Sequence, residues 1–289
     1  MQSYGYSSDK VMNGPQGGPM GPMGPMGFTP FQPDPQWQTW NRQPIQNVFQ
    51  NFTYVADPLS ELAGASGCYI KQEADCCECL CKCCSQENQY HVFANIGKDT
   101  KYLFKVQERS SCCCRCFCPA NNRTFKLEFK HIASANEFTG NVANLFAKSD
   151  KACRCTVCCC CRPEMLTYRD KTNELLSKIV YPCSCCGLTY DVYEGNNNLK
   201  YIVDISCCQC GVCCCTGSVK CYNIEIPIYD AKKKGAAIGM ILKKKYQDCG
   251  EYCTNADTFE IVFPSDASPM DKFNIICCGL MIDYMQFEV

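Results

Sequence analysis

The fold of this chain of 289 residues is decided by stretches such as FKLEFK, residues 125–130, in which apolar and charged side chains alternate. Alternation with a period of two puts successive side chains on opposite faces of a β-strand. The same pattern occurs at residues 102–106, 201–205, 222–228 and 259–263. These short alternating runs predict strands with one buried face, and links such as GNNN at 195–198 predict hairpins between strands.

Strands with one apolar face require a core to cover that face, and the outermost strands of a sheet expose unpaired backbone groups. We therefore predict a closed or nearly closed antiparallel sheet, because closure removes exposed edges. We expect its core to contain the last apolar stretch of the chain, residues 273–287, which is interrupted by Asn274 and Asp283. This stretch is shorter than the ~20 apolar residues that span a bilayer, and a charge at the bilayer centre costs at least about 2.5 kcal/mol. We therefore favour a helix inside the sheet, with a membrane span as the alternative.

The chain contains 32 cysteines, and most of them stand in clumps, such as residues 112–114, 158–161 and 213–215. Adjacent cysteines suit a disulfide framework poorly, because a disulfide needs two side chains that face each other. The first residues lack the basic and apolar regions of a secretory signal, so we expect the thiols to stay reduced. Three roles remain open: thioester acylation, thiolate metal binding, and packing as small apolar side chains.

Acylation is predicted at the densest clump, which is flanked by Arg154 and Arg162. Each methylene group buried in a bilayer contributes about 0.8 kcal/mol, so two or more acyl chains attach a protein stably. Each flanking arginine adds roughly 1 kcal/mol beside anionic lipids. The predicted acylation sites are Cys158, Cys159, Cys160 and Cys161.

Zinc binding is the alternative use of the cysteines. The spacing Cys-x-x-Cys occurs eight times, and four thiolates form a standard structural zinc site. The candidate ligands are Cys207, Cys210 and Cys213. The chain has 2 histidines, His91 and His131, so few bases are available to activate a cysteine nucleophile, and we do not expect an enzyme.

Residues 1–55 are predicted to form a disordered tail rich in Pro, Gly and Met, and residues 56–289 the folded domain. Residues 18–26 of the tail repeat the triplet Gly-Pro-Met, and the resulting Pro-x-x-Pro spacing could dock into an SH3 or WW groove. A formal net charge of −1 argues against a nucleic-acid partner. The lysine triplets 232–234 and 243–245 fit a solvated surface, contact with anionic headgroups, or a nuclear import signal and hence a minor nuclear pool.

The order of motifs resembles that of the phospholipid scramblase family over about residues 60–289. A Cys-rich hairpin followed by an alternating strand resembles the family at residues 108–129 and again at 207–226. The run at 153–163 resembles the family's palmitoylation motif. The segment NADTFEIVFPSD, residues 255–266, resembles its short acidic segment and is followed by a terminal hydrophobic helix, here residues 272–288.

This resemblance implies a mainly β protein, a closed tubby-like barrel of about twelve antiparallel strands around a buried C-terminal helix. It implies calcium-stimulated, ATP-independent, bidirectional movement of phospholipids between leaflets, rather than chemical catalysis. It also implies attachment to the cytoplasmic face of the plasma membrane through palmitoylated cysteines. A headgroup must cross ~30 Å of hydrocarbon, so scrambling would need homo-oligomers or local bilayer thinning. The alternative function is a palmitoylated adaptor that binds its partners through the Pro-rich tail.

Calcium is implied at the acidic segment, which the family resemblance treats as an EF-hand-like loop. The ligand places that carry a side-chain oxygen are Asn255, Asp257 and Asp266. An EF-hand also needs Gly at its sixth place and Glu at its twelfth, where this chain has Glu260 and Asp266. We therefore expect weak calcium binding, and the apolar residues of the alternating run 259–263 predict a packed β-strand within the segment.

Overall fold

The computed structural model describes residues 53–54, 57–73, 87–97, 99–118, 122–132, 144–152, 162–182, 188–209, 212, 223–233, 235–244 and 257–288. All of them belong to one structural unit, Pro33–Val289. The predicted tail lies outside the described residues except for Thr53 and Tyr54, and so do the predicted acylation sites at 158–161.

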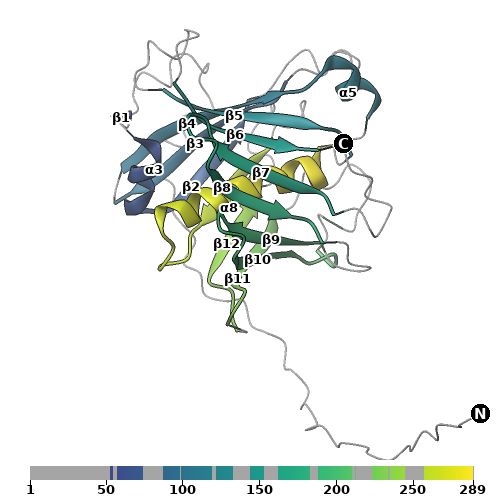
Figure 1. Ribbon diagram of the computed structural model, residues 1–289. Helices are drawn as coiled ribbons and strands as arrows, with labels where there is room; N and C mark the ends of the chain where they lie inside the picture. The colour runs from purple at the N-terminus through teal and green to yellow at the C-terminus, as the bar shows by residue number, and fades with distance from the viewer. Residues whose placement is uncertain are drawn as a thin grey trace, which may run out of the picture. The chain divides into compact units, whose positions relative to one another are not determined.

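Within the described residues, a 13-stranded sheet surrounds the last helix (Figure 1). Its strands are β1 (Thr53–Tyr54), β2 (Ala65–Gln72), β3 (Gln89–Ile96), β4 (Asp99–Arg109), β5 (Phe125–His131), β6 (Asn144–Lys151), β7 (Glu164–Arg169), β8 (Leu175–Val180), β9 (Leu188–Glu194), β10 (Leu199–Ile205), β11 (Ile224–Asp230), β12 (Gly239–Lys243) and β13 (Thr258–Val262). The short helices are α3 (Pro58–Glu61), η2 (Leu62–Gly64) and α5 (Cys112–Phe117).

Strands β2 to β13 close into a barrel. They pair in the order β4-β3-β2-β13-β12-β11-β10-β9-β8-β7-β6-β5, and β5 pairs with β4 again. Each of these pairs is antiparallel, so the predicted closed antiparallel barrel of about twelve strands is confirmed. Strand β1 is added to β4 in parallel, outside the closed ring.

The alternating runs form strands with one face turned to the core. In β5, Phe125, Leu127 and Phe129 are buried while Lys126 is exposed. Burying each large apolar side chain contributes roughly 1.5–3 kcal/mol. Strand β3 differs, because six consecutive residues within it are buried and neither face is left to water.

The predicted buried helix is confirmed as α8 (Pro269–Ile282), which runs through the barrel (yellow in Figure 1) and continues as a π-helix, η6 (Asp283–Phe287). Residues 271–282 are all buried, and Phe273 contacts the rings of Phe104 and Phe129 at centroid distances of 6.2 and 5.3 Å. Among the described helices, none has both the length and the apolar character needed to cross a bilayer.

The helix begins at Pro269 rather than at residue 272, because a capping box starts it. The Ser268 hydroxyl accepts a hydrogen bond from the backbone N–H of Asp271 at 3.2 Å, and the Asp271 carboxylate accepts one from the backbone N–H of Ser268 at 2.8 Å. Pro269 suits the first helical position, where no backbone N–H is needed. The predicted start at residue 272 was therefore three residues too late.

Lys272 fixes the start of α8 against the chain that precedes β2. Its buried ammonium group donates to the carbonyl oxygens of Leu62, Ala63 and Ala65 at 2.9, 3.1 and 2.8 Å. Leu62 and Ala63 belong to η2, and the carbonyl oxygens at the end of a helix attract cations. Burial lowers the pKa of Lys272 below its usual value.

Candidate functional site

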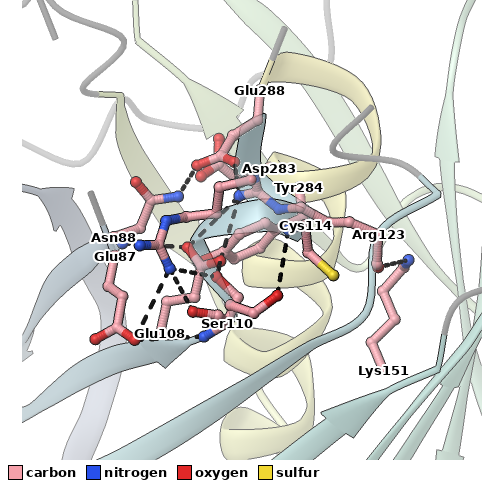
Figure 2. A network of polar contacts seen from close by, with 12 residues as sticks. Glu87, Asn88, Glu108, Ser110, Cys114, Arg123, Lys151, Asp283, Tyr284 and Glu288 are labelled. Carbon is pink, nitrogen blue, oxygen red and sulfur yellow. Dashed lines mark hydrogen bonds and ion pairs between the residues drawn. The ribbon is translucent and has the colours of Figure 1, made fainter. Parts of the chain in front are cut away.

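Charged side chains enter the barrel interior where α8 passes into η6 (Figure 2). We call this set the buried polar network. It consists of Gln72, Asn88, Tyr90, Glu108, Ser110, Arg123, Lys243, Asp257, Asp283, Tyr284 and Glu288. Because a buried charge without partners is costly, the contacts of each carboxylate decide what this network can do.

Glu108 is fully buried, and its carboxylate is well supplied with donors. It accepts hydrogen bonds from the backbone N–H of Asn88 at 3.1 Å, the Tyr284 hydroxyl at 3.0 Å and the Ser110 hydroxyl at 2.5 Å. The guanidinium of Arg123 lies 3.4 Å away. These contacts compensate the hydration that the Glu108 side chain loses on burial, so Glu108 has a structural role.

Arg123 links Glu108 to the end of the described chain. Its guanidinium lies 2.6 Å from the Glu288 carboxylate and over the ring of Tyr284, 5.5 Å from the centroid. Burial lowers the pKa of Arg123, but the charges of Glu288 and Glu108 outweigh it and raise the pKa above its usual value. Glu288 also accepts hydrogen bonds from the side-chain amides of Asn88 and Gln72. The residues after α8 are therefore tied to β2, to the β2–β3 connection and to the β4–β5 connection.

Asp283 forms the second half of the network. One carboxyl oxygen accepts a hydrogen bond from the Tyr90 hydroxyl at 2.7 Å, while the other, Oδ1, is buried and has no hydrogen-bond partner among the described residues. Burial raises the pKa of Asp283 to about 8, and the negative charge of Asp257 adds to the shift. A proton on Asp283 allows a hydrogen bond between the carboxyl groups of Asp283 and Asp257. Asp257 also accepts a hydrogen bond from the Lys243 ammonium group at 2.6 Å, so the three side chains lie in one buried cluster.

The predicted calcium ligands are not brought together. Asp257 lies directly before β13 and is paired with Lys243, whereas Asp266 lies in an exposed turn after β13. The five residues of β13 lie between Asp257 and Asp266, and an extended strand of this length spans about 17 Å. The predicted β-strand is confirmed over Thr258–Val262, with Phe259 and Ile261 buried. Asn255 lies outside the described residues.

The described part of the segment therefore does not fit an EF-hand-like loop, because a strand cannot wrap its side chains around one ion. Across the described ranges, no group of three or more His, Cys, Asp or Glu side chains is placed to hold a metal ion.

The cysteines divide into two kinds. Cys68, Cys277 and Cys278 are buried in the core, and burial raises the pKa of the Cys277 thiol to about 12, so it packs as a small apolar side chain. Cys112, Cys113, Cys207 and Cys208 are exposed instead. Of the three candidate zinc ligands, Cys207 is described, and Cys210 and Cys213 lie outside the described residues.

The buried polar network was not predicted from the sequence, although the strands carry a signal for it. In β4, Glu108 follows Phe104 and Val106 at the spacing of two that keeps a side chain on the same face. In β12, Lys243 follows Ile241 in the same way. A charge in register with buried apolar residues indicates a polar site inside a barrel, provided that the register of the strand is known.

Comparisons with known proteins give a consistent result. A family model described as Scramblase matches residues 45–289. Human phospholipid scramblase 1 is 25% identical to this chain over 202 residues, which cover 70% of this chain and 57% of that protein. The chain thus spans less than two thirds of the length of this relative. No solved structure matches the chain significantly.

Proposed function

Since this chain belongs to the scramblase family, we propose that it moves phospholipids between the two leaflets of a membrane, in both directions, without ATP and with stimulation by calcium. The proposal depends on one observation, the family match over residues 45–289, which includes every strand of the closed barrel and the helix inside it. The function is one of transport, and no chemical step is assigned to the buried polar network.

Membrane attachment is part of the proposal. We propose that acyl chains on Cys158, Cys159, Cys160 and Cys161 hold the protein at the cytoplasmic face of the plasma membrane. Because α8 is enclosed by the barrel, its apolar side chains contact protein, and we assign attachment to acyl chains. Each methylene contributes about 0.8 kcal/mol, so two or more chains suffice. A headgroup still has to cross ~30 Å of hydrocarbon, so the proposal includes homo-oligomers or local bilayer thinning.

The proposal is tested with the full-length protein, purified with its acyl chains from eukaryotic cells. The protein is reconstituted into vesicles that carry a fluorescent phospholipid, and the lipid in each leaflet is followed by chemical quenching. We expect lipid to equilibrate faster than in protein-free vesicles, in both directions, and faster again with calcium. A rate with calcium equal to that of protein-free vesicles contradicts the proposed function.

The same assay tests where calcium acts. Asp266 is exposed and Asp257 is paired with Lys243, so Asp266→Asn can be made without breaking a buried ion pair. Asp99→Asn, an exposed carboxylate at the same end of the barrel, is the matched control. If Asp266 contributes to a weak site, its variant alone needs more calcium for the same stimulation. Equal calcium responses in both variants exclude Asp266.

A lipidated adaptor is the second candidate function. The enclosed position of α8 favours it, because a barrel filled by its own helix offers a stable body to tether at a membrane. Its partners would be SH3 or WW domains bound to the Pro-rich tail. Replacing Cys158, Cys159, Cys160 and Cys161 by serine should then abolish membrane binding while tail-dependent partner binding persists. Loss of partner binding on deleting residues 1–30, with no effect on lipid movement, separates the adaptor from the scramblase.

A further inference from the structure

The cysteine-containing connections of the barrel all emerge at the same end. In an antiparallel barrel every second connection emerges at the same end, and here these are the connections β2–β3, β4–β5, β6–β7, β8–β9, β10–β11 and β12–β13. In that order they contain six, five, six, three, seven and two cysteines, so 29 of the 32 belong to connections that leave the barrel at this end. The connections at the opposite end contain none, and the other three cysteines are buried. We call the first end the cysteine end.

Two of these cysteines show how the cysteine end is arranged. Cys113 lies in α5, in the β4–β5 connection, and Cys208 lies in the turn that follows β10. Both are exposed. Five strands separate β4 from β10 in either direction around the ring, so the two thiols stand on opposite sides of the rim. They are therefore too far apart to form a disulfide with each other or to share a metal ion.

We propose that the cysteine end lies against the membrane and that Cys113 and Cys208 are further acylation sites, in addition to residues 158–161. This inference rests on the proposed attachment of the protein to a membrane. One anchoring connection leaves a barrel free to tilt, whereas anchors on opposite sides of the rim direct the barrel axis along the membrane normal. The β6–β7 connection, which contains residues 158–161, lies between these two positions on the ring.

The modification is a thioester exchange with a fatty acyl thioester as donor. The cysteine Sγ attacks the carbonyl carbon of the donor, a new S–C bond forms, and the S–C bond of the donor breaks. The thiol proton passes to the departing thiolate, so no oxidant or reductant is needed. The exposed thiols of Cys113 and Cys208 are accessible to such a donor, in contrast to the buried thiols of Cys277 and Cys278.

Acylation is measured on the full-length protein from eukaryotic cells. Hydroxylamine cleaves thioesters, and each thiol released receives a mass tag that is located by peptide mass spectrometry. We expect tags on Cys113 and Cys208, and none on the core peptide with Cys277 and Cys278, which serves as the internal control. The variants Cys113→Ser and Cys208→Ser should each lose one tag and keep the melting temperature, because both side chains are exposed. Absence of thioesters from both residues overturns the proposed sites.

Orientation is measured separately by hydrogen exchange of the acylated protein on vesicles and in detergent. We expect slower exchange on vesicles in residues 112–118 and 206–209, and unchanged exchange in the turns 195–198 and 231–233 at the opposite end. Protection of the opposite end alone overturns the orientation. Neither measurement follows lipid movement, so thioesters at both sites with no scrambling contradict the proposed function and leave this inference standing.

Discussion

Asp283 is a carboxyl group in the middle of an apolar core, and its proton is part of the structure. Its hydrogen bonds join Tyr90 of β3 to Asp257 before β13, two segments that are 167 residues apart in the sequence. From the sequence, Asp283 is visible as an interruption of an apolar stretch. Its hydrogen-bond partners cannot be identified from the sequence, because they depend on the register of strands that are distant along the chain.

We predict that Asp283→Asn removes a pH dependence of stability. The pKa of Asp283 is raised from 3.8 to about 8 in the folded protein, so the folded state keeps a proton that the unfolded state loses above about pH 4. The wild-type free energy of unfolding should therefore fall as pH rises from 4 to 8, by at most about 1.4 kcal/mol per pH unit. The asparagine keeps a donor toward Asp257 and does not titrate.

Urea unfolding at several pH values between 4.5 and 8.5 checks this prediction. Asp266→Asn, whose side chain is exposed, is the matched control and should follow the wild type. Parallel pH profiles of the wild type and Asp283→Asn would show that Asp283 is ionised in the folded state.

The strands and helices of the barrel differ in how clearly they can be predicted from the sequence. Strands such as β5 and β11, which face water on one side, alternate clearly and were predicted. Strands β3 and β8 have few exposed positions, so their sequences lack the alternation on which the prediction depends. The central helix was predicted from its length and apolar character, but its first turn was not, since Ser268 to Asp271 are recognised by their hydrogen bonds rather than by hydrophobicity.

That first turn provides a prediction for α8. Ser268→Ala removes the hydroxyl that accepts from the Asp271 backbone N–H, and the loss of an N-cap costs typically about 1 kcal/mol. We expect the free energy of unfolding to fall by that amount, measured by chemical denaturation at pH 7. Ser60→Ala is the control, because the Ser60 side chain is exposed and bonds only locally to the Asp57 carbonyl. An equal effect in both variants would mean that the capping box adds nothing specific to α8.

At the level of the whole barrel, the sequence predicted the closed sheet and the enclosed helix but not the sorting of cysteines to one end. Five alternating runs were found among the strands, and the end at which a connection emerges depends on whether the number of strands before it is odd or even. A single missed strand reverses every later connection. The sorting therefore became visible only with the complete strand order.

The enclosed helix makes the barrel dependent on residues that are distant from most strands. We predict that a chain ending at residue 262 does not fold, because the side chains of α8 that fill the interior are missing. A synthetic peptide of residues 263–289 should restore the β-sheet circular dichroism, whereas the same peptide with Phe273→Asp should not, since Phe273 is fully buried. Cooperative unfolding of the truncated chain by itself would contradict this prediction.

The position of α8 after all of the strands also affects how the protein is made. A ribosome delivers roughly 200 residues between the start of β2 and the start of α8, which takes on the order of ten to forty seconds at about 5–20 residues per second. During that time the nascent sheet has apolar faces and no helix to cover them. Newly made chains should therefore depend on chaperones until the helix leaves the exit tunnel, and a pause in translation before it would prolong that dependence.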